Sequence, residues 1–117
     1  MKYSALAIIF TSFLTVSCVS TTEKPVEDEL SRFAKANCFY AYFVKKNYDL
    51  KDIRAISGGI VEMGSYSAEK YQAVAGLIKE YKPEYSTKHN IDNDLLKCFK
   101  LDSDPEFMKS LNTIKND

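Results

Sequence analysis

The first eighteen residues have the pattern of an export signal, which decides the compartment in which the rest of the chain folds. Lys2 gives a positive start, and residues 3–14 are almost entirely apolar. This run is shorter than the ~20 residues that a membrane-spanning helix needs. It has the length of the apolar region of a secretory signal instead. We therefore expect residues 1–17 to be a signal peptide and the remainder to fold in an oxidising compartment.

Cys18 follows Ser17 directly, and this pair resembles the lipobox of bacterial lipoproteins, in which the cysteine becomes the acylated first residue. Thr15 stands where an aliphatic residue is usual. Two outcomes therefore stay open, namely acylation of Cys18 or ordinary cleavage near Ser17 or Ser20. Several acyl chains, at ~0.8 kcal/mol per buried methylene, would anchor the protein firmly. Residues 18–25 are then expected to form a short polar tether.

Two further cysteines, Cys38 and Cys98, remain in the expected mature chain. They lie 60 positions apart, so neither belongs to a short metal-binding pair such as CxxC. In an oxidising compartment we expect them to form a disulfide. Closing a loop of that length removes unfolded-state entropy worth roughly 4 kcal/mol. The alternative is two separate buried thiols.

Apolar residues recur at helical spacing along the mature chain, and no run alternates with the period of a strand over a useful length. We expect the first helix over about residues 26–46, within a single domain of residues 26–117. Four more helices are expected: one from the Asp49 cap to Gly64, one from the Ser67 cap to about Lys82, a short one after Asp92 or Asn93, and a last one after a Ser103–Glu106 capping box. The predicted fold class is all-α, a compact bundle of about five helices with one intramolecular disulfide.

Gly58 and Gly59 lie in the middle of the second expected helix. Each glycine costs ~1 kcal/mol relative to alanine at such a position. One explanation is that another helix approaches closely at this point. The other is that the helix kinks or breaks there.

The composition offers little for catalysis or for nucleic-acid binding. His89 is the only histidine, and the carboxylate pairs that begin at Asp92 and Asp102 sit at expected helix starts, where capping explains them. Without Lys2 the chain has 15 basic and 16 acidic residues, and no basic stripe that would suit a nucleic acid is visible. We expect no enzyme activity, no cofactor and no metal site.

The longest irregular segment, Lys82 to Asn90, has no apolar periodicity. Polar loops on a rigid scaffold often carry function. The candidate contact residues are therefore Glu84, Tyr85, Ser86, Thr87, Lys88, His89 and Asn90. Tyr85 has two interpretations. A tyrosine in a polar loop is a common anchor in protein–protein contacts, but the side chain could also fold back onto the domain.

Four stretches of this chain resemble a known family. They are Asn37-Cys38, the run Glu-Met-Gly-Ser-Tyr-Ser-Ala-Glu-Lys-Tyr at 62–71, Tyr85-Ser86-Thr87-Lys88, and the run Leu-Leu-Lys-Cys-Phe-Lys-Leu at 95–101. Together with the export signal, they are similar to the immunity proteins that neutralise type VI secretion amidase effectors. The resemblance covers about residues 30–112.

The resemblance implies a periplasmic, all-helical protein that binds a peptidoglycan-cleaving cysteine amidase and occludes its active site. It also implies a homodimer that presents a loop to the effector, here Tyr85 to Asn90, and paired cysteines that correspond to Cys38 and Cys98. Apart from the resemblance, an acylated Cys18 would anchor the protein to a membrane. Two other functions stay open: a periplasmic lipoprotein that binds another envelope protein, and a small-ligand carrier with a pocket of ~300 Å³ or more between its helices.

Overall fold

The computed structural model describes residues 28–117, and this part of the chain is helical, without a β-strand. Its elements are α1 (Glu29–Lys46), α2 (Lys51–Met63), α3 (Ala68–Glu80), α4 (Asn93–Lys100), the short 3₁₀ helix η1 (Leu101–Ser103) and α5 (Pro105–Asn116). The predicted all-α class is confirmed. The expected signal peptide, Cys18 and the tether fall on residues that lie outside the described range.

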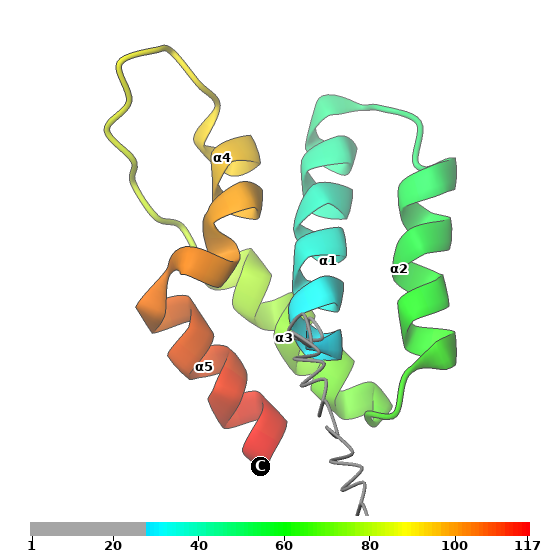
Figure 1. Cartoon of the computed structure of the whole chain (residues 1–117). Coiled ribbons are helices and arrows are strands. Elements are labelled where there is room, and N and C mark those ends of the chain that lie inside the picture. Colours follow the sequence, from blue (N-terminus) through cyan, green and yellow to red (C-terminus); the bar gives the residue numbers. More distant parts are fainter. Residues whose placement is uncertain (1–27) are drawn as a thin grey trace, which may run out of the picture.

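The helices pack around α1 (Figure 1). The chain turns after α1 and returns as α2 along one side, α3 crosses behind, and α4 lies along the other side. The core is the face that α1 shares with α3, α4 and α5, and its largest fully buried side chains are Phe107, Leu30, Ile78, Leu111, Val74, Cys38 and Cys98. Within residues 28–117, none of these helices has the length and hydrophobicity that crossing a bilayer requires.

Four of the five helix starts agree with the expected ones to within a residue or two, whereas α1 begins at Glu29, three residues after the expected residue 26. Asp92 caps α4, because its side chain accepts a hydrogen bond from the backbone N–H of Asp94 at 2.9 Å. The cap of α5 is Asp104 rather than the expected Ser103, because the Asp104 carboxylate accepts the N–H of Glu106 at 2.9 Å and lies nearer the first turn. α3 ends at Glu80, two residues before the expected Lys82. Pro83 disfavours helical geometry at the residue before it, because its ring clashes with that residue's backbone.

The predicted disulfide is confirmed, and the alternative of two separate thiols is wrong. Cys38 and Cys98 are bonded, with their Cα atoms 5.5 Å apart, and both are buried. The bond joins the middle of α1 to the last turn of α4. It therefore fixes the helix that follows the long polar loop to the central helix of the bundle.

α2 packs on α1 through one face only. Ile53 is its single buried residue, whereas Ile56 and Met63 are 56% and 92% exposed. Within residues 28–117, the expected close approach of another helix to the glycine pair is wrong, and so is the expected break. The helix runs unbroken through Gly58 and Gly59, and a Cβ added at either would meet nothing within 4 Å.

A network of hydrogen bonds closes the turn between α2 and α3. The Glu29 carboxylate accepts the backbone N–H of Ser65 at 3.0 Å and the hydroxyl of Tyr71. Gly64 lies directly beneath this contact, and a Cβ at this position would collide with the Tyr71 hydroxyl, the Glu29 carboxylate and, at 2.8 Å, the carbonyl of Ile60. Only glycine leaves room for these groups, which gives a physical reason for the glycine in the Glu-Met-Gly-Ser-Tyr run.

Replacing Gly64 by alanine tests this close approach. We expect Gly64→Ala to reduce the free energy of unfolding by about 1–3 kcal/mol, because the added methyl group forces the network apart. Gly76→Ala is the matched control, since a Cβ on that glycine of α3 meets nothing within 4 Å. It should stabilise the protein by roughly 0.5–1 kcal/mol through helix propensity. Urea unfolding followed by circular dichroism measures both, and equal effects of the two variants would contradict the argument.

Candidate functional site

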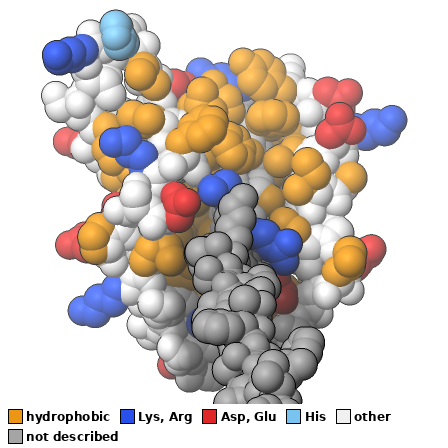
Figure 2. Space-filling model, in the orientation of Figure 1, with side chains coloured by type: hydrophobic (Ala, Val, Ile, Leu, Met, Phe, Trp, Pro, Cys, Tyr) orange, Lys and Arg blue, Asp and Glu red, His pale blue; other side chains and the backbone are white. Residues whose placement is uncertain are grey.

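The long polar loop between α3 and α4, Tyr81 to Asp92, projects beyond the helices (Figure 1). Its residues from Ser86 to Asn90 are all exposed. In Figure 2 the one histidine of the sequence, His89, lies at the end of a projecting lobe with a basic side chain beside it. The loop therefore presents a small, exposed polar tip, in agreement with the irregular polar segment predicted from the sequence.

The first part of the loop is held against the domain through Tyr81. Its hydroxyl donates a hydrogen bond to the Asp104 carboxylate at the start of α5, and it lies 3.3 Å from the hydroxyl of Tyr85. Burial, and then the hydrogen bond to Asp104, raise the pKa of Tyr81. The same hydrogen bond lowers the pKa of Asp104. The loop is thus tied to α5, which comes much later in the sequence.

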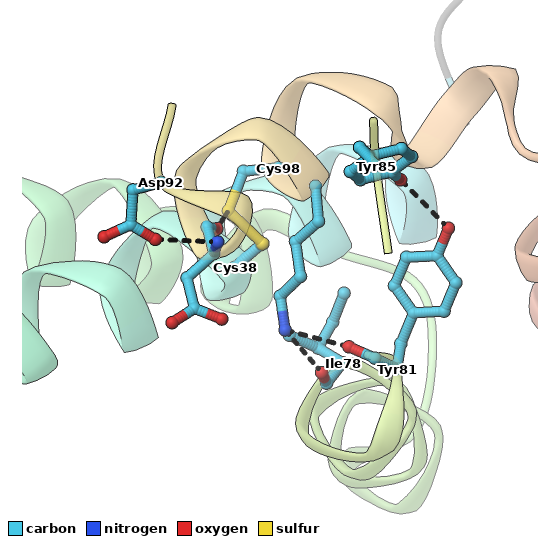
Figure 3. The surroundings of a disulfide bond; sticks show 8 residues. Cys38, Ile78, Tyr81, Tyr85, Asp92 and Cys98 are labelled. Atoms are coloured by element: carbon cyan, nitrogen blue, oxygen red, sulfur yellow. Dashed lines mark hydrogen bonds between the residues drawn. A yellow bond between two sulfur atoms is a disulfide. The ribbon is translucent and has the colours of Figure 1, made fainter. Parts of the chain in front are cut away.

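Tyr85 folds back onto the domain, which was the second of its two interpretations. The side chain is half-buried, and the ammonium of Lys100 lies 4.9 Å from the centre of its ring. Figure 3 shows its hydroxyl directed toward that of Tyr81. Tyr85 is therefore part of the loop's base, and the part that remains free for a partner is the tip from Ser86 to Asn90.

Lys97 of α4 donates hydrogen bonds to backbone carbonyls at the C-terminal end of α3. Its Nζ donates hydrogen bonds to the backbone carbonyls of Ile78 at 3.3 Å and Tyr81 at 3.0 Å (Figure 3). Carbonyls in the last turn of a helix lack partners within the helix, and a cation there is also favoured by the helix dipole. Desolvation lowers the pKa of Lys97. A half-buried ammonium on α4 thus fixes the point at which the loop leaves α3.

Two ion pairs and the disulfide hold the far end of the loop. Lys46 at the end of α1 pairs with Asp92 at 2.9 Å, and the neighbouring Lys45 pairs with Asp94. The hydrogen bond from Lys46 lowers the pKa of Asp92. Exposed pairs of this kind contribute little each, but here they lie about two turns along α1 beyond the covalent link. Both ends of the loop are therefore fixed to the bundle.

An open cleft of about 640 Å³ lies beside the base of the loop, between α1, the end of α3 and the first turn of α4. We call it the lysine cleft and define it by its apolar floor and its basic rim. The floor includes Ala41, Val44 and Ile78, and the rim includes Lys79, Lys82 and Lys97. Sequence reasoning missed this feature, because it arises from three helices and no local pattern marks it.

The carboxylate pairs have structural partners. Asp92 and Asp104 cap helices, and Asp102 lies 3.6 Å from the ammonium of Lys35. Over residues 28–117, no group of three or more histidine, cysteine or acidic side chains could hold a metal ion. The described residues thus bring together a loop and a cleft, both suited to contact with another molecule.

The family model Tai4, described as type VI secretion system (T6SS), amidase immunity protein, matches residues 28–111. The chain belongs to this family. The match runs from the first described residue into α5 and includes the disulfide, the loop and the lysine cleft. Tai4 proteins act as immunity proteins and not as enzymes, so the resemblance seen in the sequence is confirmed. No curated protein and no solved structure matches the chain.

The loop anchor at Asp104 should be sensitive to acid. A carboxylate whose folded-state pKa is lowered stabilises the fold fully above its ordinary pKa, here 3.8, and this contribution is lost as pH falls through the folded-state pKa. We expect the free energy of unfolding to fall as the pH is lowered from ~5 to ~2. In Asp104→Asn this dependence should be shallower and the stability at pH 7 lower, because the amide cannot ionise.

Glu62→Gln, which changes an exposed carboxylate on α2, is the control and should keep the pH dependence of the natural chain. Urea unfolding at pH 7, 5 and 3 measures the three proteins. The same acid dependence in Asp104→Asn and the natural chain would show that this carboxylate does not anchor the loop.

Proposed function

We propose that this chain neutralises a peptidoglycan-cleaving amidase effector of the cysteine type by binding it and occluding its active site with the loop between α3 and α4. The observation that carries the proposal is the form of the loop. It has an exposed polar tip and a base that is fixed at both ends. A plug of this kind needs no chemistry of its own.

The order of the loop favours tight binding. A flexible segment loses conformational entropy when it binds, at about 0.5–1.5 kcal/mol for each immobilised side chain. Here the base is already fixed by Tyr81, Tyr85 and Lys97. At the tip, the hydroxyl of Thr87 donates to the backbone carbonyl of His89, and the N–H of Ile91 donates to the same carbonyl at 2.9 Å. Much of the ordering is therefore complete before the effector arrives.

The proposal places the protein in the periplasm, where the substrate of such an amidase lies. The export signal expected in residues 1–17 supports this location. An acylated Cys18 would hold the domain at a membrane, and cleavage elsewhere would release it. The mass of the exported chain distinguishes the two forms.

The proposal also includes a homodimer, and the exposed flank of α2 that faces Glu29 and Arg32 of α1 is the best candidate for its interface. Ile56 and Met63 are exposed there beside Gly59, so that α2 presents apolar side chains next to bare backbone. A second helix can approach such a surface closely. Exposed apolar side chains that gather in this way often mark a protein–protein contact.

A double variant of the tip tests the plug. We expect Lys88→Ala/His89→Ala to weaken binding of the purified amidase by about thirtyfold or more, as loss of a central contact does. Full inhibition of peptidoglycan cleavage should then require a large excess of the variant. Lys109→Ala/Asn112→Ala, a pair of exposed positions on α5, is the control and should bind like the natural chain. Calorimetry gives the affinity, and circular dichroism verifies the fold. Unchanged affinity in the tip variant would remove the loop from the mechanism.

Charge on α2 tests the dimer separately. Ile56→Glu/Met63→Glu should convert the dimer to a folded monomer, because both side chains are exposed in the single chain and a buried carboxylate pair would repel across the interface. Ile91→Glu, at an exposed apolar position near the end of the loop, should leave the dimer intact. Analytical ultracentrifugation measures both. A natural chain that is monomeric at micromolar concentration would refute this part of the proposal.

The lysine cleft bears on the ligand-carrier alternative. Its volume of about 640 Å³ lies within the ~300–1,000 Å³ typical of pockets for small ligands. A carrier, however, encloses most of its ligand's surface, whereas Val44 on the floor of this cleft is 51% exposed. The family match and the open cleft together favour contact with a protein. Binding to an unrelated envelope protein gains no support from the family.

A further inference from the structure

The lysine cleft exists because α1 is longer than the helix that covers it. The buried residues of α3, Tyr71, Val74 and Ile78, lie over the first part of α1. α3 then ends at Glu80, and the chain departs as the loop. The inner face of α1 continues without this cover, so that Ala41 and Val44 remain exposed. The result is an apolar strip that the fold itself does not use.

The charge around this strip is positive. Lys45 is neutralised by Asp94, and the ammonium of Lys97 is held by two backbone carbonyls that carry no formal charge. Among residues 28–117, no carboxylate pairs with Lys79 or Lys82. Glu84 is the one further carboxylate among the lining residues of the cleft. Three ammonium groups are thus left without an acidic partner around an apolar floor.

We propose that the lysine cleft is a second effector-binding surface, which receives an acidic segment of the amidase that carries an apolar side chain. The inference rests on the proposed function, because it takes the amidase as the partner. The cleft and the loop are continuous, since Lys82, Pro83 and Glu84 line the one and begin the other. An effector that encloses the tip of the loop therefore has its surface next to the cleft.

The two parts of the cleft have separate roles in this contact. The apolar floor gains free energy when Val44 and Ala41 are covered, which slows dissociation. The lysines attract the acidic segment over a distance and speed association, an effect that salt screens. Binding should therefore become weaker and slower to form as salt increases, although the domain as a whole has almost no net charge.

Two variants separate these roles. Lys79→Glu/Lys82→Glu reverses the rim, and Ala41→Trp fills the floor from an exposed position on α1. Their controls are Lys109→Glu on α5 and Ala73→Trp on the outer side of α3, both exposed and away from the cleft. The partner is a purified peptidoglycan-cleaving cysteine amidase of the type VI secretion class, and surface plasmon resonance at 50 and 300 mM salt gives both rate constants. Thermal melts verify that each variant is folded.

We expect the rim variant to reduce the association rate by about tenfold and to lose most of its salt dependence. Ala41→Trp should raise the dissociation rate by about tenfold at an unchanged association rate. Both controls should match the natural chain. If the cleft variants bind within twofold of the natural chain while the Lys88→Ala/His89→Ala variant does not, the cleft is refuted and the plug stands. If the natural chain does not bind the amidase, the proposed function itself fails.

Discussion

The covalent bond between Cys38 and Cys98 is the constraint on which the arrangement of this domain depends. It closes a loop of 60 residues that contains α2, α3 and the polar loop. Such a closure is worth roughly 4 kcal/mol in the chain-entropy model, whereas the net stability of small domains is only about 5–15 kcal/mol. Since α4 has a single fully buried residue, which is Cys98 itself, the bond replaces the apolar burial that this short helix lacks.

The disulfide also explains how a long polar segment can be rigid. One end of the loop is held by hydrogen bonds at the end of α3, through Tyr81 and Lys97. The other end is held by α4, which the disulfide fixes to α1. The loop therefore spans two fixed points and needs no apolar residues at its tip. Rigidity at the base and polarity at the tip come from different parts of the sequence.

Much of this fold could be predicted from the sequence, because its signals are local. Helical spacing, helix caps and proline positions act within a few residues, and they gave five helices with ends close to the observed ones. The disulfide followed from compartment and cysteine count. The glycine pair in α2 is where the local signals predicted the structure incorrectly. Gly58 and Gly59 predict a close helix contact, a kink or a break within the chain, yet α2 continues without a break through both, and a Cβ added at either would meet nothing within 4 Å.

The candidate site was only partly predictable, because its contacts join distant residues. The loop stood out by its polarity, but Tyr81 reaches Asp104 and Lys97 reaches back to α3 without any local pattern. The packing of Tyr85 against the domain could not be predicted either, since its partner Lys100 lies on another element. The lysine cleft forms because α3 ends before it has covered the whole of α1. The apolar periodicity of a single helix does not indicate how far a neighbouring helix will extend along it, so the cleft could not be predicted.

The exposure of the loop tip has a consequence for how this protein can diverge. No residue from Ser86 to Asn90 is buried, so replacements there leave the interior of the bundle untouched. Because most destabilising mutations act through the interior, substitutions at these five positions should cost the fold little stability. Under the proposed function, the contact with the effector can therefore change at the tip while the scaffold that presents the tip stays the same.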